Sequence, residues 1–161
     1  MAEKGLFRVT AESYGASYQK HLLEQYKLYV QMANHVSERR TAANNYLITV
    51  NGVLVTLYAL AGSVKALSDK PLWQYVVPLA GILISVAWAA LIASHRNLNS
   101  VKFDVIHELE ARLPAALYAH EWEVAEHGKG SKYHPVSHIE LFIPWTFAGL
   151  YIVLMVVVPR F

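Results

Sequence analysis

Histidine and glutamate side chains crowd the polar stretch between the second and third apolar runs of the sequence. They are His107, Glu108, Glu110, His120, Glu121, Glu123, Glu126, His127, His134, His138 and Glu140. Glu123 with His127, and His134 with His138, are spaced four residues apart, as two metal ligands on one helix face would be. Pro135 argues against a helix through the second pair, and no HExxH motif is present. We therefore predict a solvated charged surface; a metal- or pH-responsive role is the alternative.

No enzyme motif is present. The sequence lacks a Walker A loop, a GxGxxG fingerprint, a GxSxG nucleophile elbow and a convincing catalytic triad. It contains no cysteine, which excludes disulfides and thiolate metal sites. The formal net charge of +2 is small and scattered, which argues against nucleic acid as a partner. We predict that the protein is not an enzyme and that it has no catalytic, metal-binding or cofactor-binding residues and no cofactor.

Three long runs of the sequence contain no Asp, Glu, Lys or Arg: residues 45–64, 72–94 and 141–158. A bilayer core requires about 20 apolar residues in a helix. Charged residues make up only 16% of the sequence, against roughly 25% in an average soluble domain. The sequence therefore predicts an all-α membrane protein with three transmembrane helices.

The distribution of Lys and Arg predicts the orientation of these helices. Six of these residues precede the first run and five lie between the second and third, whereas the loop after the first run has two and the tail one. Because positive charge accumulates on the cytoplasmic side, the N-terminus should be cytoplasmic and the C-terminus external. Arg39 and Arg40 are then a membrane anchor at the cytoplasmic headgroups.

The predicted organisation follows from these runs and from helical periodicity. A long cytoplasmic helix begins near Tyr14 and runs into the first span, and further cytoplasmic helices extend to Pro114 and over 115–127. Ser137 and Glu140 form a capping box for the third span. The segments are a cytoplasmic N-terminal helix (1–44), transmembrane helix 1 (45–64), a short external loop (65–71), transmembrane helix 2 (72–94), a cytoplasmic helical segment (95–137), transmembrane helix 3 (138–158) and an external tail (159–161).

Small and polar side chains recur every three or four residues within the first two spans. In the first they are Asn45, Thr49, Gly52, Thr56, Ala59 and Ser63, and in the second Gly81, Ser85, Ala89 and Ala93. Lipid gives helices no hydrophobic reason to associate, so membrane helices rely on close backbone approach, which small residues permit. We predict a helix-packing seam, within one subunit or between subunits.

A second polar face lies beside the seam of the first span. Asn44, Asn51 and Tyr58 are seven residues apart. Because an asparagine inside a membrane is costly unless it is paired or hydrated, this face should not contact lipid. Its residues are possible pore-lining groups, although no ring of acidic or basic side chains is present to select ions.

Several stretches resemble the RipA family of octameric bacterial inner-membrane proteins. They are "YQKHLLEQYKLYVQMANHVSERRTAANNYLITVN", "SHRNLNSVKFDVIHELEARLP", "YAHEWE" and "HIELFIPWTFAGLY", in that order from about Tyr18 to Tyr151. The resemblance implies a homo-octamer in the bacterial cytoplasmic membrane, linked with growth inside host cells and adaptation to the environment. A looser likeness to SLATT-type membrane effectors, which are pore-forming defence proteins, does not account for the third span.

Together these observations predict a ring-like homo-oligomer whose partners are other copies of itself and membrane lipids. The leading hypothesis is a non-enzymatic scaffolding or stress- and host-adaptation assembly. The alternative is a channel or pore whose lumen is lined by the first span.

Overall fold

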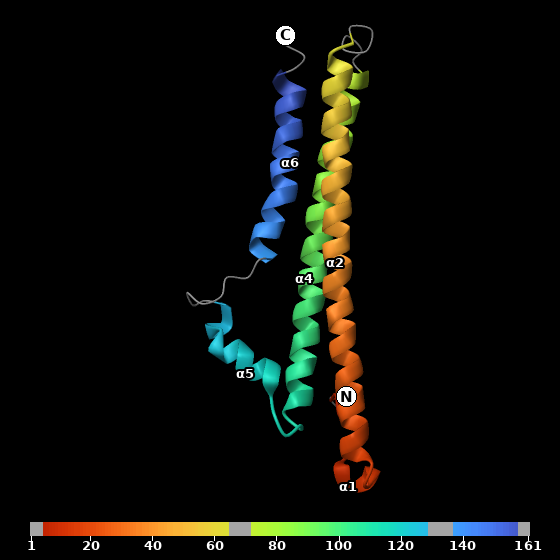
Figure 1. Ribbon diagram of the computed structural model, residues 1–161, viewed down its shortest axis with the longest axis vertical. Helices are drawn as coiled ribbons and strands as arrows, with labels where there is room; N and C mark the ends of the chain where they lie inside the picture. The colour runs from red at the N-terminus through yellow and green to blue at the C-terminus, as the bar shows by residue number, and fades with distance from the viewer. Residues whose placement is uncertain (1–4, 65–71, 129–136, 158–161) are drawn as a thin grey trace. The chain divides into compact units, whose positions relative to one another are not determined.

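The structure is a computed structural model that describes residues 5–64, 72–128 and 137–157 (Figure 1). Every regular element in these ranges is helical, which confirms the predicted all-α class. Three helices are long and apolar enough to cross a membrane, as predicted. The predicted loop 65–71 and tail 159–161, together with His134, lie outside the described residues, as do the side chains of the predicted capping residue Ser137 and of His138.

The chain divides into two compact units, and its two longest helices contribute to both. Unit 1 contains the described residues 5–37 and 97–128, and unit 2 contains 38–64, 72–96 and 137–157. Helix α2 (Tyr18–Gly62) and helix α4 (Val77–Glu110) both pass from one unit to the other. Each unit is described separately below.

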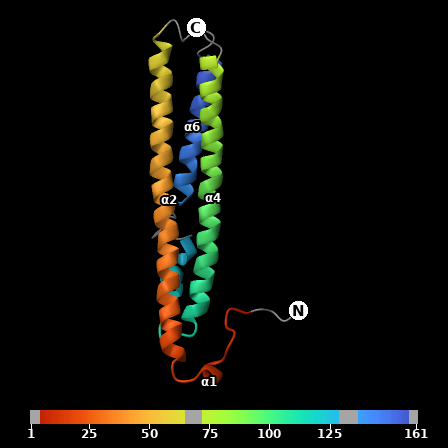
Figure 2. The ribbon, with the colours of Figure 1, turned by 90° about the vertical axis from the view of Figure 1, so that its right-hand side faces the viewer.

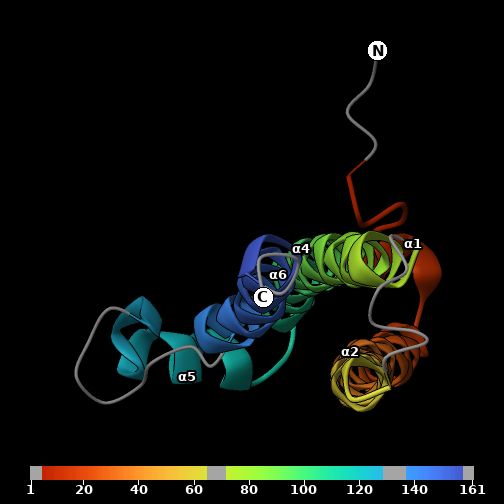
Figure 3. The same cartoon turned by 90° about the horizontal axis from the view of Figure 1, so that it is seen from above.

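Unit 2 consists of three helices that lie side by side, α2 and α6 running in one direction and α4 in the other (Figures 1 and 2). Helix α6 spans Ser137–Val157. The core between these helices is built around Trp88, Ile92 and Tyr151, each only 1% exposed. Figure 3 shows the same helices from above, where α6 overlaps α4 and α2 is drawn apart from both. The described parts of all three predicted spans therefore belong to unit 2.

Two prolines lie in or near the irregular points of these helices. Helix α4 is preceded by a π-helical turn, Leu72–Val76, which ends two residues before the buried Pro78. Because a proline ring clashes with the carbonyl four residues earlier, the wider π-helical turn gives the ring room. Pro144 lies inside α6, where the ring is also buried.

Unit 1 contains the N-terminal part of α2, the C-terminal part of α4 and the shorter elements. The short helix α1 (Ala11–Tyr14) ends at Gly15, whose φ of 89° separates it from α2. Helix α5 (Leu117–Val124) and the 3-10 turn η2 (Glu126–Gly128) follow α4. Leu22, Ala33 and Ile106 form the buried core. Compared with the prediction, the long first helix begins four residues later because Gly15 interrupts it, and α4 ends before the stretch leading to Pro114.

Candidate functional site

A cluster of polar side chains joins the three helices of unit 2. The hydroxyl of Ser85 on α4 donates to Asn51 Oδ1 on α2 at 3.3 Å and to the Gly81 carbonyl at 2.8 Å. The Tyr151 hydroxyl on α6 donates to the backbone carbonyl of Asn51 at 3.2 Å. Asn51 Nδ2 donates to the Leu47 carbonyl at 2.8 Å. Asn51 is fully buried, so the bonds with Ser85 and the Leu47 carbonyl replace the water that its side-chain amide would otherwise need.

Gly81 allows this cluster to form. A Cβ atom at this position would collide with the ring of Tyr151. The missing side chain therefore lets the aromatic ring of α6 lie directly on the backbone of α4. Ser85 and Ala89, the next members of the predicted seam of α4, are also buried, whereas Ala93 is exposed. The seam of α4 is thus used largely within the subunit.

The predicted pore-lining face also points into unit 2. Trp88 Nε1 on α4 donates to Asn44 Oδ1 at 2.9 Å. Tyr58 is 5% exposed, and its ring lies parallel to that of Trp73, with centroids 6.3 Å apart. In the single chain, Asn44, Asn51 and Tyr58 therefore contact α4 and the turn before it, and none of them is exposed. Their role as pore-lining groups of an assembly stays a prediction. The Tyr58 hydroxyl and Trp73 Nε1 have no hydrogen-bond partner among the described residues.

The seam of α2 has the opposite placement, because all six of its members are exposed in the single chain. They are Asn45, Thr49, Gly52, Thr56, Ala59 and Ser63. Nothing lies within 4 Å of a Cβ placed on Gly52. The hydroxyls of Thr49 and Thr56 donate to the carbonyls four residues earlier, at 2.9 and 2.8 Å. Such bonding satisfies these two hydroxyls inside the helix, so they can meet an apolar partner without leaving a donor unpaired.

The predicted arginine anchor separates into two different environments. Arg39 is exposed, whereas Arg40 pairs with Glu140 on α6, with Arg40 Nε 3.5 Å from Glu140 Oε2. The two side chains are only 21% and 20% exposed. Arg40 therefore ties α2 to α6, while Arg39 has the exposure that an anchor at lipid headgroups needs.

In unit 1 the carboxylate of Glu110 collects three hydrogen bonds. Oε1 accepts from the Tyr26 hydroxyl at 2.8 Å and from the Tyr118 N–H at 3.0 Å, and Oε2 accepts from the Ala119 N–H at 3.0 Å. Glu110 is 1% exposed, so the predicted solvated surface is wrong for this residue. Burial, followed by the bond to Glu110, raises the pKa of the Tyr26 hydroxyl far above its ordinary value.

Six other described members of the histidine- and glutamate-rich stretch are exposed: Glu108, His120, Glu121, Glu123, Glu126 and His127. His107 and Glu140 are half-buried. Glu123 and His127 were predicted as a possible ligand pair, but His127 lies beyond α5 with a positive φ of 54°, and its ring packs edge-on against Trp122. No group of three histidine, aspartate or glutamate side chains that could hold a metal ion occurs in ranges 5–64, 72–128 and 137–157.

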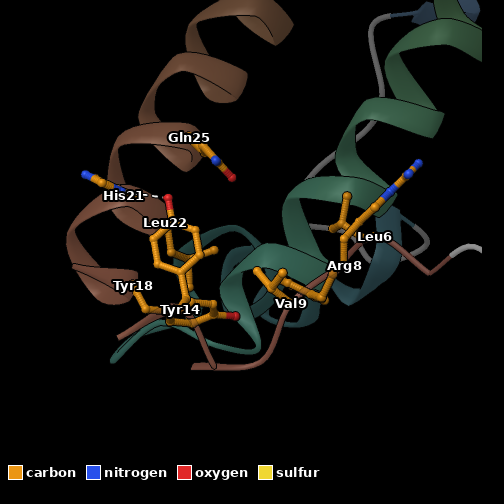
Figure 4. A pocket seen from close by; sticks show the side chains of 9 residues that line it. Leu6, Arg8, Val9, Tyr14, Tyr18, His21, Leu22 and Gln25 are labelled. Atoms are coloured by element: carbon orange, nitrogen blue, oxygen red, sulfur yellow. Dashed lines mark hydrogen bonds between the residues drawn. The ribbon is translucent and has the colours of Figure 1, made fainter. Parts of the chain in front are cut away.

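A shallow cavity of about 200 Å³ lies between the N-terminal segment and the first turns of α2 (Figure 4). Its lining residues are Leu6, Phe7, Arg8, Val9, Tyr14, Tyr18, His21, Leu22 and Gln25. The Tyr14 hydroxyl and His21 Nδ1 form a hydrogen bond of 2.9 Å across it. Arg112 fixes the segment by stacking 3.6 Å from the Phe7 ring centroid and by donating to the Tyr18 hydroxyl. These contacts hold the N-terminal segment against the rest of unit 1.

A family model described as the octameric membrane protein family (8xMP) matches residues 23–158. The chain belongs to this family. The match includes α4, α6 and all of α2 except its first five residues, and it covers the polar clusters around Asn51 and Glu110. No curated protein and no solved structure matches the chain. The predicted likeness to octameric membrane proteins is confirmed at this level, and the RipA and SLATT likenesses stay predictions.

In this member of the 8xMP family, three structural residues were missed by the sequence analysis. They are Trp88, Tyr151 and Glu110, each 1% exposed. An aromatic ring in an apolar run has no pattern that distinguishes a buried position from a lipid-facing one. Glu110 lies among other charged residues, and only the turn that follows α4 brings the start of α5 back to it.

Proposed function

We propose that this chain is a subunit of a homo-octamer in the bacterial cytoplasmic membrane, where the assembly has a non-enzymatic scaffolding or stress- and host-adaptation role. The family name supports the octamer, and three long apolar helices support residence in a membrane. The excess of Lys and Arg before the first span and between the second and third supports a cytoplasmic N-terminus and an external C-terminus.

The observation that carries this proposal is the separation of two exposed stripes on α2. The six small and polar seam residues form one stripe. Large apolar side chains form the other: Tyr46, Val53, Leu57 and Leu60, which are 50–68% exposed. At 100° per residue, the two stripes lie about 100° apart on the helix, and both point away from Asn51.

Each stripe suits a different neighbour. Bulky side chains fill the irregular space between lipid tails, whereas small side chains let a second backbone approach closely. Because the polar face of α2 is already occupied by α4 and α6, the seam is the surface left for a neighbouring copy. Helix α2 therefore contacts its own subunit, a second copy and lipid on three separate faces.

Native mass spectrometry of the detergent-held protein tests this assignment. Gly52→Leu places a large side chain in the seam, where the single chain leaves open space. We expect this substitution to convert octamers to smaller species without unfolding the subunit. Val53→Leu changes the adjacent residue on the bulky stripe and should leave the octamer intact. An octamer that survives Gly52→Leu would refute the seam as the contact between copies.

A channel is the second candidate, because the seam, the stripe of small residues on α2, also carries polar groups. Asn45 places an amide on this stripe, and hydroxyls at Thr49 and Thr56 follow it. A lumen would have to use this stripe, since Asn44, Asn51 and Tyr58 face other helices of their own subunit. Ion or dye flux through liposomes that is lost in an octameric Asn45→Leu variant would favour the channel; silence under all triggers would favour the scaffold.

A further inference from the structure

Helix α5 has few means of holding itself together. It contains 8 residues and none is buried. Isolated helices shorter than roughly 12–15 residues are marginal in water. Its N-cap residue is Ala116, which makes no side-chain capping bond. The first N–H groups of a helix have no partner within the helix, so an α5 without outside help would begin with unsatisfied donors.

Glu110 supplies the missing acceptors from another helix. Its two carboxylate oxygens accept the N–H groups of Tyr118 and Ala119, both at 3.0 Å, which lie in the first turn of α5. A negative charge at this end of a helix is also favoured by the helix dipole. The ring of Phe103 on α4 packs edge-on against Tyr118, with centroids 5.6 Å apart.

Tyr26 makes the same carboxylate a junction of three helices. Its hydroxyl donates to Glu110 Oε1 at 2.8 Å from α2. This bond reaches the same oxygen that accepts the Tyr118 N–H, so it holds the carboxylate in place and reduces the freedom that the side chain must lose to act as a cap. We propose that Glu110 is a positioning residue that caps α5 from α4, and that α5 docks as a helix only while this carboxylate holds its first turn.

The charge of Glu110 controls this contact, because a protonated carboxyl group loses acceptor capacity. The titratable groups that face it are Tyr26 from α2, Tyr118 from α5 and His107 on its own helix. Burial raises the pKa of Glu110, but the N–H groups of Tyr118 and Ala119, the Tyr26 hydroxyl and the charge of His107 together lower it below the ordinary value. Stabilisation by a group with a lowered pKa is complete above its unfolded value and is lost as the pH falls through the folded value. The cap therefore holds at neutral pH and is lost in acid.

Hydrogen–deuterium exchange of the complete detergent-held protein, followed on peptides that cover 117–124, tests the proposal. In Glu110→Gln we expect these amides to exchange roughly tenfold faster or more, as the loss of a charge-assisted hydrogen bond implies. Peptides within α2 should keep their wild-type rates. Glu108→Gln makes the same change at an exposed position of the same helix and should leave α5 unaffected. Unchanged exchange in Glu110→Gln, or equal acceleration in both variants, overturns the proposal.

The pH dependence of exchange provides a second test, and its first part uses the wild-type protein alone. After correction for the intrinsic effect of pH on exchange, acid should accelerate α5 before it accelerates α2 or α4. Tyr26→Phe, which removes one donor and keeps the ring, should move this acceleration to a higher pH because it removes a bond that lowers the pKa of Glu110. Acceleration that occurs equally in all helices, or an α5 that is insensitive to acid, overturns the proposal.

Discussion

Gly81 offers the sharpest test of the packing in unit 2. The position lies under the ring of Tyr151, and a Cβ atom there would overlap three atoms of the ring. Gly81→Ala therefore forces Tyr151 to move. Because Tyr151 is 1% exposed, the ring has little free space to enter. We expect the substitution to separate α6 from α4 and to weaken the Tyr151 bond to the Asn51 carbonyl.

The magnitude follows from opposing contributions. Overpacking a well-packed core costs about 1–3 kcal/mol. A hydrogen bond between membrane helices contributes about 0.6 kcal/mol on average. Alanine stabilises an exposed helix by about 1 kcal/mol relative to glycine, and this gain offsets part of the lost stability. The net destabilisation of the subunit should be about 0.6–2.6 kcal/mol.

Unfolding by SDS in mixed micelles, followed by tryptophan fluorescence, measures this change. Gly149→Ala in α6 is the matched control, because nothing lies within 4 Å of a Cβ at that position. It should be neutral or slightly stabilising. Combining Gly81→Ala with Tyr151→Ala should cost less than the sum of the two separate losses, since the smaller side chain removes the collision. A Gly81→Ala subunit as stable as the wild type, or strict additivity, would refute the close packing of α6 on α4.

Three further predictions concern other contacts. Asn51→Leu should destabilise the subunit by only about 0.6–1.7 kcal/mol, because the bond from Tyr151 goes to the backbone and survives; the same SDS titration measures it. Arg40→Gln should lower the stability of unit 2 by about 1–2 kcal/mol, whereas Arg39→Gln should leave it unchanged and weaken only binding to anionic vesicles. Thermal melting should show a loss of stability as the pH falls through the lowered pKa of Glu110, and Glu110→Gln should remove this part of the pH dependence.

The helices themselves could be predicted because their signals are local. Runs without charged residues locate the apolar helices, and Gly15 separates α1 from α2 by its own backbone conformation. The seam of small residues could also be recognised, since its spacing repeats along one helix face. The partner of the seam could not be predicted. Residues with this spacing pack within the subunit on α4, whereas residues with the same spacing on α2 are exposed.

The sequence could not predict which neighbour each face of a helix contacts. Asn51 in an apolar run indicates a position that avoids lipid, but water in a lumen and a hydroxyl from another helix satisfy an amide equally well. Within the subunit, the Ser85 hydroxyl is the group that bonds the amide oxygen of Asn51. Glu110 shows the same limit outside the apolar runs, because its sequence neighbours are solvated and its burial depends on residues from two other helices.

The sequence by itself determined an all-helical chain with three helices suited to a bilayer, because apolarity and helical period are properties of successive residues. Only the tertiary structure decided which face of each helix meets its own subunit, since that depends on side chains up to 100 residues apart, such as Asn51 and Tyr151. The physical reason is that lipid and protein interiors are similarly apolar, so hydrophobicity brings a helix into the membrane but does not choose its neighbour.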